Sequence, residues 1–163
     1  LGGSFDPAHK GHLAISKEAK KRFKLEKIIW AVTKKNPLKA ESKTPISKKI
    51  KDCKKIIGMN SFIKVKFYEN IIKSNKTIDL INYLKKDKKI EIFFLMGADN
   101  LINFHKWFRS KLISQKCNII VFDRHGYKKN SLKSKTFKRL NNKTLTFVEF
   151  KKVNISSSQL RKI

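Results

Sequence analysis

The stretch GGSFDPAHKGH, residues 2–12, decides how the rest of this sequence is interpreted. The paired Gly2 and Gly3 have no side chains, so their backbone N–H groups can come close to a phosphate. His9 and His12 are three residues apart, and His12 opens a predicted helix, whose start carries partial positive charge. Two imidazoles at such a helix end suit an anion whose charge grows during a reaction. The spacing is neither GxxxxGKS/T nor GxGxxG, so the stretch is neither a P-loop nor a dinucleotide-binding fingerprint.

A metal site is the weaker alternative for the same stretch. Asp6, His9 and His12 would offer three zinc ligands, but their spacing is that of neither HExxH nor a zinc finger. Cys53 and Cys117 form no CxxC motif and suit no disulfide framework. We therefore predict no protein-held metal, and two reduced thiols that are typical of a cytoplasmic protein.

Strand-like and helix-like segments alternate along the chain. Strands are predicted at 27–33, 62–67, 91–96, 118–122 and 144–150, and helices at 12–24, 47–60, 77–86, 132–140 and from 157 onward. Residues 2–11 and 34–45 are predicted as loops, the latter with two prolines. This order favours an α/β fold with a doubly wound parallel sheet, as a single domain over residues 1–163. Such sheets bind ligands at the carboxyl ends of their strands, where the loops of interest follow.

The charge is strongly unbalanced. The 163 residues include 40 Lys and Arg against 12 Asp and Glu, a formal net charge of +28. A nucleic-acid surface is one explanation, but only five of the basic residues are Arg, and Arg is the residue that reads phosphates and guanine edges best. Lysine-rich coding with solvated side chains is the explanation we favour, and a polyanion-binding surface stays open. No apolar run approaches the ~20 residues of a membrane span.

The stretch at residues 2–12 resembles the first signature of nucleotidyltransferases related to class I aminoacyl-tRNA synthetases, GGSFDPxHxGH. Residues 155–161, ISSSQLR, resemble their second signature, ISSxxxR. The resemblance implies a Rossmann-like nucleotidyltransferase fold in which both motifs hold the triphosphate of ATP. It assigns His9 and His12 as catalytic residues. The ATP-phosphate ligands that it implies are Gly2, Gly3, Ser4, Phe5, Ser156, Ser157 and Arg161.

The middle of the chain resembles bacterial nicotinate-mononucleotide adenylyltransferases. The segments that carry this likeness are NPLK at 36–39, KTID at 76–79, MGADNL at 96–101, FHKW at 104–107 and RHG at 124–126. Lys39 is implied as a further phosphate ligand. The implied substrate-binding residues are Thr77, Gly97, Asp99, Trp107 and Arg124. For Arg124, a contact on the adenylate side and a contact with the substrate phosphate both stay open.

Each of the middle residues also has a plainer explanation. Thr77 is a helix N-cap candidate on any interpretation, and Asp99 would serve as one too. Trp107 by itself is more typical of core packing, but its place after Gly97-x-Asp99 favours a ligand contact, stacked on the nicotinate ring.

The resemblance implies adenylyl transfer from ATP to nicotinate mononucleotide, giving deamido-NAD and pyrophosphate, with Mg²⁺ arriving on ATP. The partners expected are these two substrates, without a membrane or a specific nucleic acid. Phosphopantetheine adenylyltransferase and a non-catalytic basic nucleic-acid-binding protein on the same fold remain alternatives. The chain opens at Leu1, where the family has a strand before the glycines, and stops at Ile163, where the family continues. We therefore expect a nucleotidyltransferase domain truncated at both ends.

Overall fold

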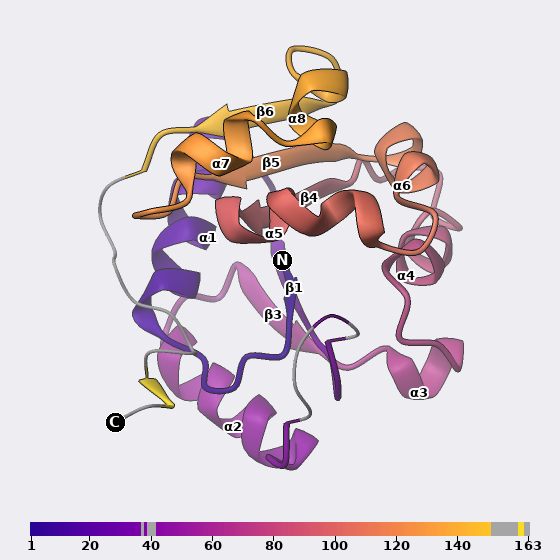
Figure 1. Ribbon diagram of the computed structural model, residues 1–163. Helices are drawn as coiled ribbons and strands as arrows, with labels where there is room; N and C mark the ends of the chain where they lie inside the picture. The colour runs from indigo at the N-terminus through magenta and orange to yellow at the C-terminus, as the bar shows by residue number, and fades with distance from the viewer. Residues whose placement is uncertain (37, 39–41, 151–159, 162–163) are drawn as a thin grey trace. The chain divides into compact units, whose positions relative to one another are not determined.

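The computed structural model describes residues 1–36, 38, 42–150 and 160–161. These residues form two compact units. Figure 1 labels the helices and strands and colours them by residue number. Unit 1 comprises Leu1–Asn75 and Lys152–Ile163, and unit 2 comprises Lys76–Lys151. Each unit is described by itself below, and the single-domain boundary over residues 1–163 stays a prediction.

Unit 1 holds a three-stranded parallel sheet with β2 at its centre. Its order is β1-β2-β3, and all pairings are parallel. The elements are β1 (Gly2–Gly3), α1 (Lys10–Phe23), β2 (Ile28–Val32), α2 (Ile46–Ile57), β3 (Ile63–Lys66) and α3 (Glu69–Ile72). Trp30, Ile28 and Val32 of β2 are buried, and α2 packs on β2 and β3.

Unit 2 repeats this arrangement with a second parallel sheet, in the order β4-β5-β6. Its strands are β4 (Phe93–Gly97), β5 (Asn118–Phe122) and β6 (Leu145–Val148). Its helices are α4 (Thr77–Leu84), α5 (Ala98–Asn103), the 3-10 turn η1 (Phe104–Lys106), α6 (Ser110–Lys116), α7 (Lys128–Leu132) and α8 (Lys135–Leu140). Buried side chains of α4, α5, η1, α6 and all three strands form one apolar core.

The predicted α/β class with parallel strands is confirmed, with corrections at element ends. Gly2 and Gly3 form β1 instead of a loop, because they pair in parallel with Ala31 and Val32 of β2. The predicted helix at 132–140 is interrupted, since α7 ends at Leu132 and the Ser134 hydroxyl caps α8 by accepting from the backbone N–H of Phe137, 3.1 Å away. The predicted helix start at 157 lies outside the described residues.

The N-terminal caps of two helices also differ from expectation. Helix α1 begins at Lys10, two residues early, because His9 caps it. Thr77 is not an N-cap: Lys76 holds that position with extended backbone, and Thr77 is the first helical residue. Asp99 likewise lies in the first turn of α5, whose N-cap is Gly97.

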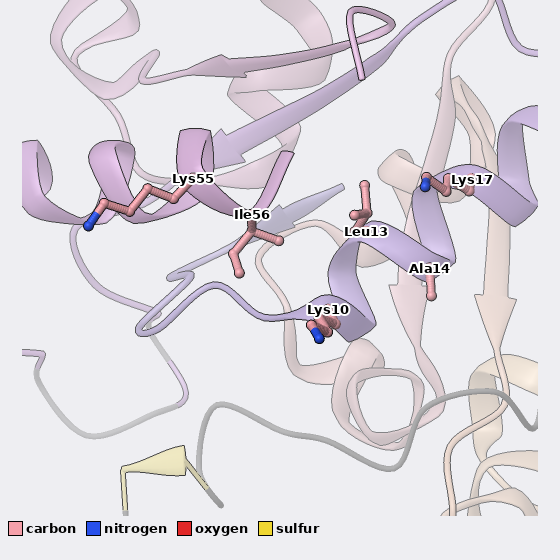
Figure 2. A pocket seen from close by; sticks show the side chains of 6 residues that line it. All are labelled: Lys10, Leu13, Ala14, Lys17, Lys55 and Ile56. Atoms are coloured by element: carbon pink, nitrogen blue, oxygen red, sulfur yellow. The ribbon is translucent and has the colours of Figure 1, made fainter. Parts of the chain in front are cut away.

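Helices α1 and α2 leave a hollow of about 360 Å³ on unit 1 (Figure 2). Its apolar surface comes from Leu13, Ala14 and Ile56, and its remaining lining residues are lysines, namely Lys10, Lys17 and Lys55. The α1 residues recur at intervals of three and four, as one helical face requires. Within the described residues, no helix combines the length and apolar character needed to cross a membrane.

Candidate active site

The two histidines of the signature loop, residues 2–12, form a reciprocal cap on α1. The Nδ1 atom of His9 accepts from the backbone N–H of Gly11 at 3.1 Å, and the Nδ1 atom of His12 accepts from the backbone N–H of His9 at 3.2 Å. The ring centroids of His9 and His12 are 3.8 Å apart. An imidazole whose Nδ1 accepts must carry its proton on Nε2. Both neutral rings are therefore Nε2–H donors at the N-terminus of a 14-residue helix.

An aromatic cluster supports His12. Phe5 is buried and stacks on Trp30, with ring centroids 5.0 Å apart and an interplanar angle of 15°. The His12 ring lies 4.7 Å from the Phe5 ring, centroid to centroid. The indole N–H of Trp30 donates to Ser16 Oγ at 2.8 Å, and Ser16 donates to the His12 carbonyl at 2.8 Å. Trp30 and Ser16 were not identified from the sequence as supporting residues. The available signal was Trp30 in a predicted buried strand, because a buried indole N–H needs a hydrogen-bond acceptor nearby.

The signature loop leaves the carboxyl end of β1. The Gly3 carbonyl accepts from the backbone N–H of Thr33 at 3.0 Å, so pairing with β2 engages part of the backbone that was predicted to cradle phosphate. Ser4 and Phe5 follow β1 directly, and Phe5 adopts a left-handed backbone with φ of 47°. Burial of its ring against Trp30 stabilises this unusual conformation.

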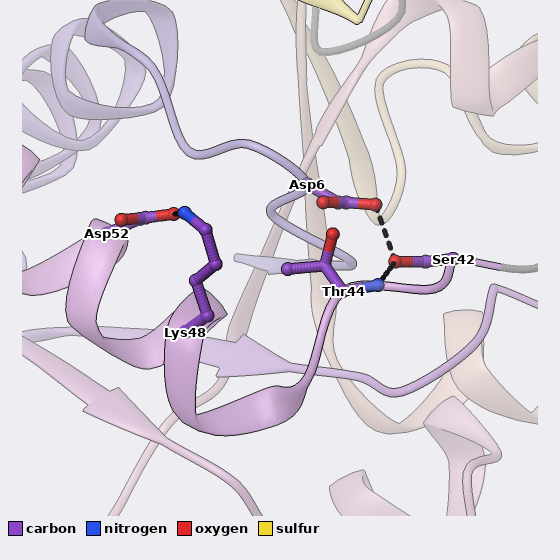
Figure 3. Close-up of polar contacts among 5 residues, drawn as sticks. All are labelled: Asp6, Ser42, Thr44, Lys48 and Asp52. Atoms are coloured by element: carbon purple, nitrogen blue, oxygen red, sulfur yellow. Dashed lines mark hydrogen bonds and ion pairs between the residues drawn. The ribbon is translucent and has the colours of Figure 1, made fainter.

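Arg161 lies against the signature loop, as the resemblance implies for the second signature. Its guanidinium donates to the carbonyl oxygen of Asp6, across 155 residues of sequence. The Asp6 carboxylate in turn accepts from Ser42 Oγ at 2.5 Å (Figure 3). The other predicted phosphate ligands of these segments, Lys39, Ser156 and Ser157, lie outside the described residues.

In unit 2, the ends of β4 and β5 bring Gly97, Asp99 and Arg124 together. Gly97 pairs with Phe122, so the two strands end side by side, and Asp99 and Arg124 follow them. Arg124 Nη1 lies 2.7 Å from Asp99 Oδ2 in a mostly buried ion pair. Asp99 Oδ1 is buried and has no hydrogen-bond partner among the residues that the structure describes. A buried carboxylate oxygen that accepts no hydrogen bond from the protein is well suited to accept a hydrogen bond from a ligand.

The position of the Asp99 carboxylate depends on the absence of a side chain at Gly97. A Cβ atom at Gly97 would lie 2.6 Å from Asp99 Oδ1, closer than real Cβ contacts. Its φ is −81°, so glycine is needed here for space and not for backbone conformation. A side chain at Gly97 would therefore displace the Asp99 carboxylate.

Trp107 and Thr77 have structural positions in unit 2, and their contact with a substrate stays a prediction. Trp107 is partly buried against the core of unit 2, with ring centroids 5.9 Å from Phe94 and 5.2 Å from Phe104. It therefore has the core role that was its plainer explanation, and its contact with a ligand stays a prediction. Thr77 begins α4, which packs against α6.

Two other kinds of reactive site are a metal centre and a nucleophilic thiol, and the described residues form neither. No group of three His, Cys, Asp or Glu side chains that would hold a metal occurs among the described residues. Cys53 and Cys117 are buried, unpaired thiols, and burial raises the pKa of Cys53 to about 12 and that of Cys117 to about 11. Neither thiol is a nucleophile at neutral pH, since the thiolate is the reactive form.

Comparison with known proteins identifies the family. The cytidylyltransferase-like family model matches residues 1–163. A Pelagibacter ubique protein named "Probable nicotinate-nucleotide adenylyltransferase" is 68% identical over 163 residues, covering 100% of this chain and 91% of the relative. A Clostridium botulinum protein of the same name is 34% identical over 99% of this chain and 82% of its own length.

A solved structure agrees in fold. Plasmodium falciparum nicotinic acid mononucleotide adenylyltransferase, complexed with NaAD, superposes with a TM-score of 0.81 at 22% identity, over 99% of this chain and 80% of that one. The fold is thus that of the nucleotidyltransferases. With its full-length match to the family model and its relatives at 68% and 34% identity, the chain belongs to the cytidylyltransferase-like family, among the nicotinate-nucleotide adenylyltransferases.

Proposed function

We propose that this chain transfers the adenylyl group of ATP to nicotinate mononucleotide, giving deamido-NAD and pyrophosphate in NAD biosynthesis. The names of its relatives support the substrates. The observation that carries the chemistry is the paired His9 and His12, both with Nδ1 occupied and Nε2 protonated at the start of α1.

The reaction is an in-line displacement at the α-phosphorus of ATP. An oxygen of the 5′-phosphate of nicotinate mononucleotide forms the new P–O bond, and the bond to the β-phosphate bridging oxygen breaks. The electron pair leaves with pyrophosphate. Because the attacking phosphate is already anionic at neutral pH, the enzyme needs neither a nucleophilic side chain nor a strong base. Catalysis then depends on positioning and on charge stabilisation.

The predicted ATP ligands all come from unit 1. His9 and His12 donate from Nε2 to the phosphates, with His12 nearest the developing charge, and the positive end of α1 adds to their effect. The backbone of Gly2, Gly3, Ser4 and Phe5 completes the cradle around the phosphates. The β- and γ-phosphates are assigned to Lys39, Ser156, Ser157 and Arg161.

The predicted mononucleotide ligands all come from unit 2. Asp99 Oδ1 accepts from a donor on the mononucleotide, while Arg124 keeps the carboxylate in place. Trp107 stacks on the nicotinate ring, and Gly97 leaves room for the Asp99 carboxylate. The backbone at Thr77 is assigned to the nicotinate carboxylate, as a helix start suits an anion.

Mg²⁺ enters as part of the substrate MgATP, held by phosphate oxygens and water. Asp6, the acid of the signature loop, is already engaged by Ser42 and Thr44, which suits a metal carried by the nucleotide. We place the reaction in the cytoplasm, where two unpaired thiols are stable.

The test is the fate of an α-labelled phosphate. The purified chain, given α-labelled MgATP and nicotinate mononucleotide, is expected to form labelled deamido-NAD and an equal amount of unlabelled pyrophosphate. Label that stays in ATP, or appears as AMP or ADP without any dinucleotide, would refute the proposal.

A further inference from the structure

We propose that Asp6 is a positioning residue for adenylyl transfer: it fastens residues 42–44 and Arg161 to the signature loop, and so keeps that loop and Arg161 in the arrangement that binds the ATP phosphates. This inference rests on the proposed function, because it concerns how the same ATP site is assembled.

The Asp6 carboxylate fixes the far end of the segment between β2 and α2. Its Oδ2 accepts from Ser42 Oγ at 2.5 Å, and the Thr44 side chain also hydrogen-bonds to the carboxylate. The Ser42 hydroxyl accepts in turn from the backbone N–H of Thr44 at 3.3 Å (Figure 3). These hydrogen bonds therefore tie residues 42–44 to the signature loop, although Ser42 and Asp6 are 36 residues apart in the sequence.

The near end of the same segment is fixed by a buried lysine. Lys49 of α2 is 1% exposed, and its Nζ donates to the carbonyls of Thr33 at 3.3 Å and Lys34 at 3.0 Å. Glu69 of α3 accepts from the Thr33 hydroxyl and from the backbone N–H of Lys34. Thr33 and Lys34 on one side, and Ser42 and Thr44 on the other, are thus attached to other elements, and Asp6 supplies the second of these attachments.

These contacts are stronger when the Asp6 carboxyl group is ionised. Burial, the largest single cause, raises the pKa of Asp6, but the hydrogen bonds from Ser42 and Thr44 and the charges of Lys49 and Arg161 together outweigh it. The pKa is therefore held below its ordinary value, and the group is ionised at neutral pH. Lys49 is buried with Asp6 and Glu69 as its facing charges, so loss of either carboxylate leaves a buried cation less compensated.

The main chain of Asp6 makes the second attachment. Its carbonyl accepts from the Arg161 guanidinium, which is the arginine of the second signature. One residue thereby contacts both Ser42 and Arg161, the latter a predicted phosphate ligand. We expect a change in the Asp6 side chain to shift this carbonyl and, through it, Arg161.

The experiment measures ATP and mononucleotide binding separately. Asp6→Asn keeps the size of the side chain and removes its charge. Because hydrogen bonds to charged groups are worth more than neutral ones, we expect the Kd for ATP, by calorimetry, and the KM for ATP to rise about tenfold. The KM for nicotinate mononucleotide should change by less than about twofold. Ser42→Ala should raise the ATP values about threefold and add little to Asp6→Asn, since both act through one contact.

Asp52→Asn is the matched control. Asp52 forms an exposed ion pair with Lys48 at 2.8 Å along α2, which Figure 3 shows outside the Asp6 network. Its variant should bind both substrates as the wild-type chain does, because an exposed pair of this kind is worth little. An unchanged Kd for ATP in Asp6→Asn would overturn the proposal, as would an equal loss for both substrates.

The remaining outcomes also decide the matter. If Asp6→Asn does not fold, Ser42→Ala decides alone: an ATP-specific loss supports the proposal, and no loss overturns it. If the wild-type chain binds ATP but forms no deamido-NAD, the proposed function fails, and the titrations still settle the role of Asp6. A wild-type chain that does not bind ATP would overturn both.

Discussion

His12 is held at its ring and its backbone, by groups from three segments. Its Nδ1 accepts from the backbone of His9, its ring packs on Phe5, and its carbonyl accepts from Ser16, which Trp30 fixes in turn. A donor that is already oriented costs no reorganisation when charge develops in the transition state. This is the physical basis for assigning His12 the larger catalytic role.

His12→Ala should therefore lower kcat far more than it weakens ATP binding. Loss of one oriented donor is expected to cost about 10²-fold or more in kcat. His105→Ala is the control, because the His105 side chain is exposed and has no assigned role. Steady-state kinetics with a parallel ATP titration measures both quantities. A near-normal kcat in His12→Ala would remove this residue from the mechanism.

Trp107 combines a core contact with a predicted ligand contact. Trp107→Ala should raise the KM of nicotinate mononucleotide and nicotinamide mononucleotide alike, by about fivefold, since aromatic stacking contributes ~1 kcal/mol beyond area burial. Because both rings are flat and similar in size, the preference for the acid should survive. The affinity for ATP should stay nearly unchanged.

The same substitution should lower the free energy of unfolding by about 2 kcal/mol, because Trp107 packs against Phe94 and Phe104. Phe108→Ala, at an exposed neighbour, controls for general effects on the segment. A loss of ATP affinity in Trp107→Ala, seen in the same kinetics, would place this residue on the adenosine side and invert the pocket assignment.

At the scale of elements, the junction of β4 and α5 depends on close approach. Gly97→Ala would place a methyl group 2.6 Å from Asp99 Oδ1, so the carboxylate must move and strain its pair with Arg124. We expect the KM for nicotinate mononucleotide to rise about tenfold or more, as for a broken contact to a charged group, with a smaller change for ATP. Asp99→Asn should show the same selectivity by kinetics. Normal mononucleotide binding in Gly97→Ala would mean that Asp99 does not contact this substrate.

The sequence predicts the long apolar elements and the signature residues well, for a local reason. Strands β4 and β5 are apolar at nearly every position, and the histidine spacing is visible without any long-range contact. Two-residue β1 has no apolar side chain, so only its pairing with β2 reveals it. Short helices such as α3 and α5 span too few residues for a helical period to emerge.

Contacts between distant residues could not be predicted in this way. Ser42 and Asp6 are 36 residues apart, and nothing in either local sequence indicates their hydrogen bond. The same holds for Trp30 and Ser16, whose partnership depends on how α1 lies on β2. The signature loop was thus recognisable as a binding loop, while the residues that support it required the structure.

At the scale of the whole molecule, the net charge of +28 needs an account. Many lysines of α1 and α2 are exposed and lie off the buried helical faces, which favours solvated charge over a dedicated binding surface. Binding to single- or double-stranded oligonucleotides should then be weak and should fall by a factor of ~10³ or more between about 50 and 200 mM salt. Fluorescence anisotropy would measure this. Tight, sequence-selective binding at physiological salt would instead support a nucleic-acid partner.

The two units divide the predicted ligands by substrate. Every residue assigned to ATP phosphates belongs to Leu1–Asn75 or Lys152–Ile163, and every residue assigned to the mononucleotide belongs to Lys76–Lys151. Variants in unit 1 should therefore change ATP parameters first, and variants in unit 2 should change mononucleotide parameters first. The central claim is that residues of unit 2 select nicotinate mononucleotide as the acceptor of the adenylyl group.

The most direct test of that claim is kcat/KM for three acceptors, measured side by side with the same preparation and saturating MgATP. We predict that nicotinate mononucleotide is used best, nicotinamide mononucleotide less well, and phosphopantetheine at no rate above background. The strong positive charge should favour the acid further. Faster adenylyl transfer to phosphopantetheine, or no transfer to any of the three, would contradict the account.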